Sequence, residues 1–430
     1  MSTLKVNKLR DTAGSADAIT LDPNGGAVLA GVTTVTSVKV GAAVTISESG
    51  IEASGIGITC ANINGTQIGG RRNLIINGDM RIAQRGTSST GTTYGLDRMK
   101  QEHSGTDEAP TYAQVDVSSG TTPYTLGFRK ALKVTNGNQT SGAGSSDYVY
   151  WWTVLEAQDV SNSGWNYTSA SSFITLSFWI KSSVAQNFYG FLQTSDGTSQ
   201  GLAYETGSLT ADTWTKIVKT IPGNSNLQFD NDNGAGLYWA PARAFDGTDR
   251  TASMSLDTWA AYSGSSRTPD ATSTWYTTND ATLEITGLQM EVGPQATSFE
   301  HRSMGEELSL CQRYYFKLGK LDYISQHMSA NEVYGIGMSD NDDVNIYGMI
   351  NFPVPLRIPP TAIDQSGSAS DYRVRRDTNK TCSGVPTFVN AAEHFCRDNF
   401  PSSSHGWGTG QMLWCMSAGA SGYLGFEAEL

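Results

Sequence analysis

Apolar and polar residues alternate along many short segments of this chain, with the two-residue period of half-buried β-strands. The clearest run, LEITGLQMEV at 283–292, is ended by Gly293-Pro294. Short strands separated by turn residues, without a long helical pattern, predict an antiparallel sandwich or jelly roll of about 200–250 residues. Comparable runs predict further strands at 131–135, 148–155, 173–181, 188–192 and 214–221.

Two segments border this region. The first, NLIINGDMRIAQRG at 73–86, predicts one more strand with an Asn-Gly-Asp turn or bulge signal inside it. In the second, from 305 onward, a helical spacing places Leu308, Cys311 and Tyr315 on one face. We therefore interpret 283–316 as a joint, in which a strand closes one β domain and a short helix opens the next.

After 317 the strand pattern returns at a smaller scale. The run FPVPLRIPPT at 352–361 cannot be a central strand, because proline lacks the amide hydrogen that strand pairing needs. Together these patterns predict a second, smaller sandwich. Its expected strands lie at 334–338, 344–352, 372–374, 411–416 and 423–430.

Residues 1–70 contain no Trp, Tyr or Phe and are rich in Gly, Ala, Thr, Val and Ile. One copy of such a segment lacks the bulky side chains to enclose a core. It is therefore either a flexible tail or a strand-rich shaft wound around identical copies. The β-branched content favours the shaft, since disordered tails are poor in Val and Ile. A homotrimer is the expected closed symmetry.

These patterns predict an all-β protein with three parts. Residues 1–70 form an N-terminal anchor and intertwined shaft, 71–303 a central antiparallel jelly roll, and 304–430 a smaller C-terminal β-sandwich. With 430 residues, the chain is long enough for each folded part to bury its own core.

Composition narrows the range of partners. Only 16% of the residues are charged, the formal net charge is −12 and the isoelectric point is near 4.9. Nucleic acid and anionic membrane surfaces both require clustered Lys and Arg, so neither is expected as a partner. A neutral partner such as a sugar fits this charge. No apolar run approaches the ~18 residues of a membrane span, and no secretory signal is visible, so we expect a soluble protein.

The five cysteines are scattered and form no CxxC pair. We predict reduced structural thiols, with one bridge among Cys382, Cys396 and Cys415 as the alternative.

Sugar binding needs exposed aromatic faces flanked by polar side chains. Trp179 and Trp214 lie in regular apolar alternation and are predicted to be core residues. Several other aromatic residues lie among Gly, Pro, Ser and Asp, as exposed loop residues do, although core packing is the competing interpretation for each of them. The glycan-binding candidates are Trp151, Tyr204, Trp239, Trp259, Trp275 and Tyr276.

Two acidic turns, 230–234 and 340–343, concentrate the oxygen ligands that calcium prefers. We name Asp230 and Asp232 as the candidate calcium ligands, with a solvated acidic turn as the alternative, and no other cofactor is expected. No pair of carboxylates, nucleophile motif or histidine pair is visible, so we predict that the protein is not an enzyme.

Two phrases, NLIINGDMRIAQRG from Asn73 and GLQMEVGPQATSFEHRSMGEELSLCQRYY from Gly287, resemble tail-fibre and other virion-surface structural proteins of tailed bacteriophages, including phages of marine cyanobacteria. In that family the first phrase opens, and the second closes, a jelly roll similar to carbohydrate-binding modules. The FPVPLRIPPT phrase is similar to a segment of the family's C-terminal β domain, and STLKVNKLRD resembles its virion-anchoring starts. The resemblance implies a homotrimer on the virion.

The leading hypothesis is a homotrimeric, non-enzymatic tail fibre, assembled in the host cytoplasm and located on the virion. Residues 1–70 would bind other virion tail proteins, while the two sandwiches would present loops to host-surface polysaccharide or lipopolysaccharide. Three weak sites on one stalk would reinforce one another. The alternatives are a structural adaptor or head-attached fibre, and, third, a polysaccharide depolymerase.

Overall fold

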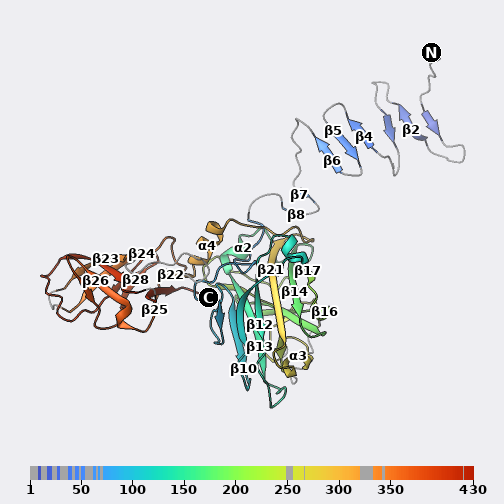
Figure 1. Ribbon diagram of the computed structural model, residues 1–430. Helices are drawn as coiled ribbons and strands as arrows, with labels where there is room; N and C mark the ends of the chain where they lie inside the picture. The colour runs from blue at the N-terminus through green and yellow to red at the C-terminus, as the bar shows by residue number, and fades with distance from the viewer. Residues whose placement is uncertain are drawn as a thin grey trace. The chain divides into compact units, whose positions relative to one another are not determined.

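The computed structural model describes residues 71–430 except 248–254, 266, 320–332, 341–343 and 420, and within 1–70 only the backbone of eight short strands. The chain divides into two compact units, Met1–Ala61 and Asn62–Leu430. Nearly all of the regular structure is β and the sheets are antiparallel, which confirms the predicted fold class (Figure 1).

In the first unit two three-stranded sheets are formed by consecutive strands. The sequence predicts that 1–70 form a shaft wound around sister copies. The side chains of this segment lie outside the described residues, so the shaft stays a prediction. The strands of the two sheets are β1 (Lys8–Arg10), β2 (Asp17–Leu21) and β3 (Ala27–Leu29), then β4 (Ser37–Val40), β5 (Val44–Ser47) and β6 (Gly50–Ala53). A short hairpin, β7 (Asn62–Ile63) and β8 (Thr66–Gln67), begins the second unit.

The central region is a sandwich of two sheets, here called sheet I and sheet II. Three short helices, α1 (Thr122–Thr125), α2 (Ala157–Ser161) and α3 (Thr274–Thr277), lie in their connections. Sheet I has the order β10 (Lys100–Ser104), β13 (Tyr148–Glu156), β18 (Ala235–Arg243), β15 (Asn187–Thr194), β16 (Gln200–Ser208), β20 (Ala260–Ala261), with β19 (Phe245–Asp246) also paired to β13. Sheet II has the order β17 (Thr215–Pro222), β14 (Phe173–Ser182), β21 (Thr282–Val292), β12 (Lys130–Thr135), β11 (Thr111–Asp116), β9 (Ser88–Ser89).

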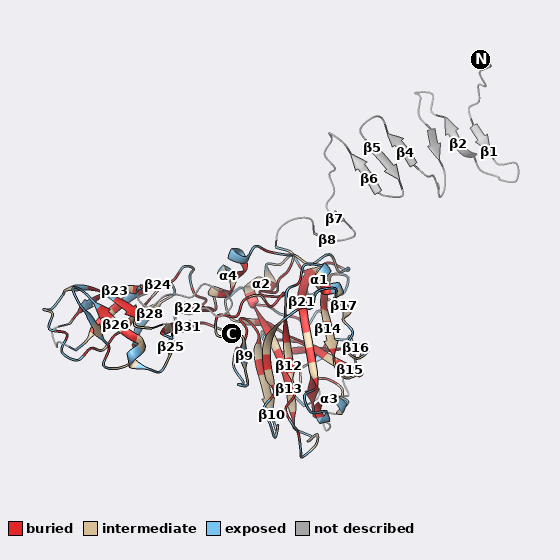
Figure 2. Ribbon diagram, viewed as in Figure 1, coloured by how far each residue is buried: buried red, intermediate tan, exposed pale blue. Residues whose placement is uncertain are grey.

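The alternation of inward- and outward-facing side chains along the strands explains how the two sheets enclose a core. Successive side chains point to opposite faces of a sheet, so every second residue of a strand can enter the core. Leu176, Phe178 and Ile180 of β14 are fully buried, while Trp179 between them is only partly buried. Figure 2 shows buried residues along the strands of both sheets. All six strands predicted for this region are present, and β21 ends at Val292, before Gly293-Pro294, as expected.

Strand β18 was not predicted, and it contains Pro241, a residue that argues against a central strand. The structure accommodates this proline in a bulge. Tyr189 pairs with Arg243 and Phe191 pairs with Ala240, so that Pro241 and its neighbour lie opposite a single residue of β15. A bulge leaves one residue without its ladder partner, and the missing amide hydrogen of proline therefore costs little there.

The predicted strand over 73–86 is wrong. This segment is an irregular buried loop, in which Asn77 and Met80 have positive φ angles of 59°. The Asn77 side chain takes the place of a strand partner: its Oδ1 accepts the amide of Ile82 at 2.9 Å, and its Nδ2 donates to two carbonyl oxygens, including that of Asp97 at 3.0 Å. The Asn-Gly-Asp signal therefore marks a loop stabilised by its own asparagine.

This loop lies along the end of β21, so the two phrases that carry the phage resemblance contact each other. Asn73 Nδ2 donates to the carbonyl of Leu288 at 3.0 Å, and the amide of Met290 donates back to Asn73 Oδ1 at 3.0 Å. Further along, buried Glu307 accepts the amide of Asn77 at 2.5 Å and forms an ion pair with Arg302. The opening and closing segments of the sandwich thus form one polar network.

Helix α4 (Met304–Gln312) follows β21, as predicted, and its N-cap residue Ser303 accepts the amide of Glu306 at 3.3 Å. Leu308 and Cys311 face a small cluster with Ile76, whereas Tyr315 already belongs to the next strand.

The C-terminal region is a second sandwich with its own core, which includes Ile350, Tyr372, Cys396 and Phe426. Its larger sheet, sheet III, has the order β27 (Asn379–Thr381), β26 (Tyr372–Arg375), β30 (Met412–Ser417), β23 (Val333–Ser339), β24 (Ile346–Asn351), β29 (Phe395–Asn399), β28 (Thr387–Ala392). The smaller sheet has the order β22 (Tyr315–Gly319), β31 (Tyr423–Glu427), β25 (Ile363–Gln365), and a 3-10 turn, Ala369–Asp371, precedes β26.

Charged side chains join the two sandwiches. Arg313 donates to both carboxylate oxygens of buried Glu156, at 2.7 and 2.8 Å, and Tyr314 donates to the same carboxylate at 2.6 Å. Burial alone would raise the pKa of Glu156, but these hydrogen bonds outweigh it and lower the pKa. Near the end of the chain, Glu429 forms an ion pair with buried Arg98.

Two further observations concern cysteines and membranes. Cys311, Cys382, Cys396 and Cys415 are free and buried, and Cys60 lies outside the described residues. Within the described part of the chain, no helix has the length and apolar character that crossing a bilayer requires.

Candidate functional site

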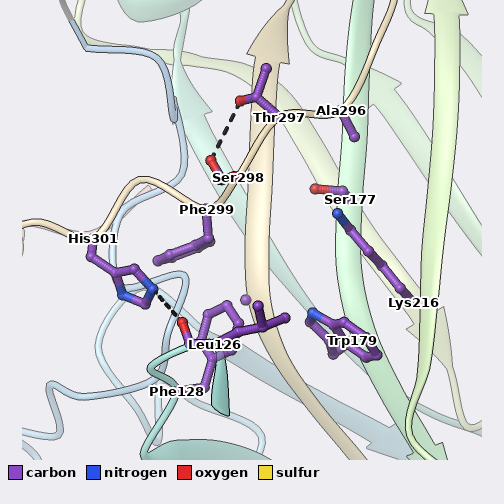
Figure 3. A pocket seen from close by; sticks show the side chains of 11 residues that line it. Leu126, Phe128, Ser177, Trp179, Lys216, Ala296, Thr297, Ser298, Phe299 and His301 are labelled. Atoms are coloured by element: carbon purple, nitrogen blue, oxygen red, sulfur yellow. Dashed lines mark hydrogen bonds between the residues drawn. The ribbon is translucent and has the colours of Figure 1, made fainter. Parts of the chain in front are cut away.

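An open cavity of about 340 Å³ lies on the outer face of sheet II (Figure 3). Its floor is formed by β14, β17 and β21, and its rim by two connections that follow α1 and β21. Among the described residues, no Asp or Glu lines the cavity. The lining residues are Leu126, Phe128, Ser177, Trp179, Lys216, Gly287, Ala296, Thr297, Ser298, Phe299 and His301.

Strand register brings an indole ring and an ammonium group together on one side of the cavity. Trp179 of β14 pairs with Lys216 of β17 and with Thr286 of β21. Outward-facing side chains in adjacent strands lie about 4.5–5.5 Å apart at their Cβ atoms, so Trp179 and Lys216 are direct neighbours. Figure 3 shows both pointing into the cavity. The Trp179 ring is only partly buried.

Aromatic rings form the opposite side. Phe128 and Phe299 are in edge contact, with ring centroids 4.9 Å apart, and His301 lies 4.9 Å from Phe299. His301 Nε2 is 2.9 Å from the carbonyl oxygen of Leu126, which holds the imidazole across the rim. This contact fixes the position of the imidazole ring, which forms part of the cavity wall.

A bulge in β21 shapes the floor. Ser177 pairs with Gln289 while Trp179 pairs with Thr286, so Gly287 and the following residue lie opposite one residue of β14. Gly287 has a φ of +67°, a conformation that glycine adopts without steric cost. Bulges are common next to functional sites because they redirect neighbouring side chains.

Two polar groups in the cavity are uncommitted. Among the described residues, neither the Lys216 ammonium nor the Ser177 hydroxyl makes a hydrogen bond or ion pair. Thr297 is engaged instead: its hydroxyl donates to Glu291 at 2.6 Å and accepts from Arg72 at 3.0 Å. The cavity therefore combines an aromatic face with a free cation and a free hydroxyl, the groups that bind a sugar ring and its hydroxyls.

Glycoside hydrolysis uses two carboxyl groups on either side of the scissile bond. None of the described residues that line this cavity carries a carboxyl group.

The structure places the six predicted glycan-binding residues in the core of the first sandwich, so their rings have no face open for stacking on a sugar. Tyr204, for example, donates to the carbonyl of Pro241 at 2.9 Å and accepts from Trp239 Nε1 at 2.7 Å. The expectation of exposed loops is corrected because Gly and Pro here mark bulges and tight turns within packed structure. The buried six are Trp151, Tyr204, Trp239, Trp259, Trp275 and Tyr276.

The two tryptophans predicted to be core residues, Trp179 and Trp214, lie on the outer face of the first sandwich. Trp179 and Trp214 are partly buried and lie against a small outer cluster with Phe128 and Phe299. Lys181 stands over the Trp214 ring at 5.2 Å, and its ammonium forms an ion pair with Glu284 at 3.0 Å. Regular alternation was the correct signal, but it placed these residues on the outer face.

Sheet I carries a second aromatic surface that was not predicted, in which Trp152 is partly buried and Tyr150 is buried. Tyr148, Tyr150 and Trp152 alternate along one face of β13, with successive ring centroids 5.3 and 5.5 Å apart, and Tyr238 of β18 lies 5.5 Å from Trp152. The run YVYWW at 148–152 contained the signal, since Trp151 faces the core and Trp152 therefore faces outward.

The acidic turn at 230–234 is hydrogen bonded within itself and to a neighbouring turn. Asp232 Oδ1 accepts the amide of Gly234 at 2.9 Å, and the amide of Asp230 donates to Asp196 at 2.9 Å. Across the part of the chain that the structure describes, no group of three or more Asp, Glu, His or Cys side chains is placed to hold a metal ion. Calcium binding at Asp230 and Asp232 stays a prediction, and residues 341–343 of the other acidic turn lie outside the described residues.

No protein-family model matches the chain, and no curated protein matches it at a significant level. Among solved structures, the enzymatically active domain of tailspike protein 4 of bacteriophage CBA120 is similar over 51% of this chain and 21% of its own, at 10% identity and a TM-score of 0.27. The N-terminal CBM22-1-CBM22-2 tandem domain of Xyn10C from Paenibacillus barcinonensis is similar over 86% of this chain and 98% of its own, at 8% identity and a TM-score of 0.25.

A family 30 carbohydrate binding module is similar over 51% of this chain and 87% of its own, at 12% identity and a TM-score of 0.21. The match to the tailspike domain spans only about a fifth of that chain. All three TM-scores are below 0.5, so the activities of these proteins do not transfer to this chain.

Proposed function

We propose that this chain binds glycan in the cavity beside Trp179, and that it does so as a homotrimeric tail fibre of a bacteriophage virion, on host-surface polysaccharide or lipopolysaccharide. The observation that carries the glycan proposal is the outward-facing Trp179 ring beside the uncommitted Lys216 ammonium and Ser177 hydroxyl. The tail-fibre part rests on the paired opening and closing phrases and on the aromatic-free composition of 1–70.

In this proposal a pyranose ring lies with its C–H face on Trp179. Lys216 and Ser177 donate to the sugar hydroxyls, and Phe128 and Phe299 exclude water from the other side. The chemistry of the cavity is binding alone. Residues 1–70 join three copies and attach them to other tail proteins of the virion, so that weak sites act together.

The decisive experiment compares two tryptophan variants of the full-length chain. Trp179→Ala should weaken binding to purified host envelope polysaccharide by about tenfold or more, because a stacking face is lost. Trp214→Ala is the matched control: its ring lies in the same outer cluster but does not line the cavity. Equal affinities of the wild type and Trp179→Ala would overturn the assignment of this cavity.

The second aromatic surface, around Trp152, provides an internal comparison. A loss of binding with Trp152→Ala and none with Trp179→Ala would move the glycan site to sheet I. Release of reducing ends from the polysaccharide would instead favour the depolymerase alternative. Retention in the virion without any binding to host cells would favour the structural adaptor.

A further inference from the structure

The outer face of sheet III is apolar, although it belongs to the middle strands of a seven-stranded sheet. Ile336 of β23 pairs with Met349 of β24 on one side and with Trp414 of β30 on the other. Two residues further along β23, Met338 pairs with Tyr347 of β24 and with Met412 of β30. These six residues form two adjacent rows across three strands, and we call them the sheet III face.

Side chains on this face are open to solvent to an unusual extent. Ile336, Met338, Met349, Met412 and Trp414 are each 47–67% exposed. Together they leave on the order of 500 Å² of apolar surface uncovered, at the upper end of the patches found on ordinary monomers. A groove of about 580 Å³ runs over the face. None of the described residues covers it.

The composition of the face is that of a protein interface rather than a sugar site. Met, Trp, Tyr and Arg are enriched at the centres of protein interfaces, and this face has three methionines, one tryptophan and one tyrosine beside Arg397 and Arg375. The Arg397 guanidinium lies 4.2 Å from the Tyr347 ring, and that of Arg375 lies 5.8 Å from the Trp414 ring. Aliphatic and thioether side chains offer few partners to sugar hydroxyls.

We propose that the sheet III face packs against the same face of the sister copies of this chain, so that the three faces of the homotrimer meet around one axis. The described residues that line the groove include the carboxylate of Asp340 and the guanidinium of Arg397, so the surface carries both charges that a copy of itself can match. Its apolar area is more than half of the ~800 Å² that each partner contributes to a standard stable interface.

The proposal rests on the homotrimer of the proposed function. Copies joined through 1–70 present this face to one another at an effective concentration in the millimolar range, at which a modest interface is occupied. The C-terminal sandwiches then associate directly, and the sheet III face is buried between copies.

Cross-linking of the full-length chain tests this surface. Met338→Cys and Ile336→Cys are introduced with Cys60→Ser, because the other four cysteines are buried. Val218→Cys is the matched control: Val218 is 44% exposed, on β17 of the first sandwich. A short bis-maleimide should join copies in the Met338→Cys and Ile336→Cys proteins, and not in the Val218→Cys protein. Equal yields at all three positions would overturn the proposal.

Light scattering and single-maleimide labelling separate the other outcomes. Labelling of Met338→Cys should be slow in the trimer and should become rapid when dilution separates the copies. An oligomer whose face labels freely at every concentration leaves the trimer standing but overturns this interface, and assigns the face to a different partner. A face that stays unlabelled after the copies have been separated is covered by its own chain, which also overturns the proposal. A monomeric chain contradicts both the trimer and this interface, whereas glycan binding through Trp179 is measured independently.

Discussion

Gly287 lies directly against the ring of Phe128: a Cβ atom added at Gly287 would be 2.7 Å from Phe128 Cζ. The same glycine has a φ of +67° at the bulge of β21. Because Gly287 has no side chain, the Phe128 ring can pack directly against β21. The same glycine therefore permits both the bulge of β21 and the position of Phe128 in the cavity.

Gly287→Ala should therefore destabilise the first sandwich by about 1–3 kcal/mol, since it adds a clash to a conformation that is unfavourable for alanine. Glycan binding should weaken as well, because Phe128 must move. Gly305→Ala is the control: Gly305 lies in α4 with open space around it, and alanine there should be neutral or stabilising. Denaturant unfolding measures both, and equal effects of the two changes would contradict this account.

Removing the ammonium of Lys216 should weaken glycan binding by about threefold to tenfold without changing stability, because Lys216 is exposed and its ammonium makes no hydrogen bond or ion pair with the described residues. Lys216→Arg should retain most of the affinity, since it keeps a donor at the same place. Lys219→Ala, on the same strand but outside the cavity, serves as the control. Titration calorimetry with the host polysaccharide distinguishes these cases, and an unchanged affinity of Lys216→Ala would exclude a role for this residue.

Asp398 predicts a pH dependence of the C-terminal sandwich. It is fully buried, and burial raises the pKa of its carboxyl from 3.8 to about 6, although a hydrogen bond from Cys396 opposes the change. Because the folded pKa lies above the unfolded value, ionisation costs stability in the folded state. The free energy of unfolding should thus fall by on the order of 2–3 kcal/mol as pH rises from about 4 to about 6.

Asp398→Asn should remove this dependence and stabilise the sandwich at pH 7. Asp377→Asn, at an exposed position of the same sandwich, should leave the pH profile unchanged. Urea unfolding followed at several pH values measures the effect. A free energy of unfolding that rises between pH 4 and pH 6 in the wild type, but not in Asp398→Asn, would contradict this explanation, which requires a fall.

Breaking the charge cluster between the sandwiches should be costly. Glu156→Ala leaves Arg313 and the Tyr314 hydroxyl without their shared acceptor, and should reduce stability by about 3–5 kcal/mol. Tyr314→Phe removes a single hydrogen bond and should cost about 1–3 kcal/mol. Thermal unfolding of the two variants should therefore differ clearly, and indistinguishable unfolding temperatures would show that Arg313 does not depend on Glu156.

Periodicity predicted the strands of sheet II well, because residues such as Ile174, Leu176 and Phe178 alternate with outward-facing neighbours. The order of strands in the sheets depends on contacts between distant segments, which periodicity does not encode. Strand β18 was missed because a proline in a bulge has the same local appearance as a proline in a loop.

The site was predicted less well, and the physical reason is specific. Alternation shows that Trp179 and Phe178 face opposite sides, but it does not show which side is covered. Trp179 was assigned to the core because it lies in regular apolar alternation, whereas Trp275 was assigned to the surface because of its polar neighbours. Both assignments used the local sequence, whereas the layer arrangement of the sandwich decides which side is covered.

The network between Asn73 and the end of β21 closes a loop of more than 200 residues. Until β21 emerges and docks, the buried side chain of Asn73 lacks its partners at Leu288 and Met290, and water must occupy their places. Such distant closure is slow relative to local pairing. The first sandwich should therefore mature in a late step, and a protease that cuts the nascent 73–86 segment would report how long that step takes.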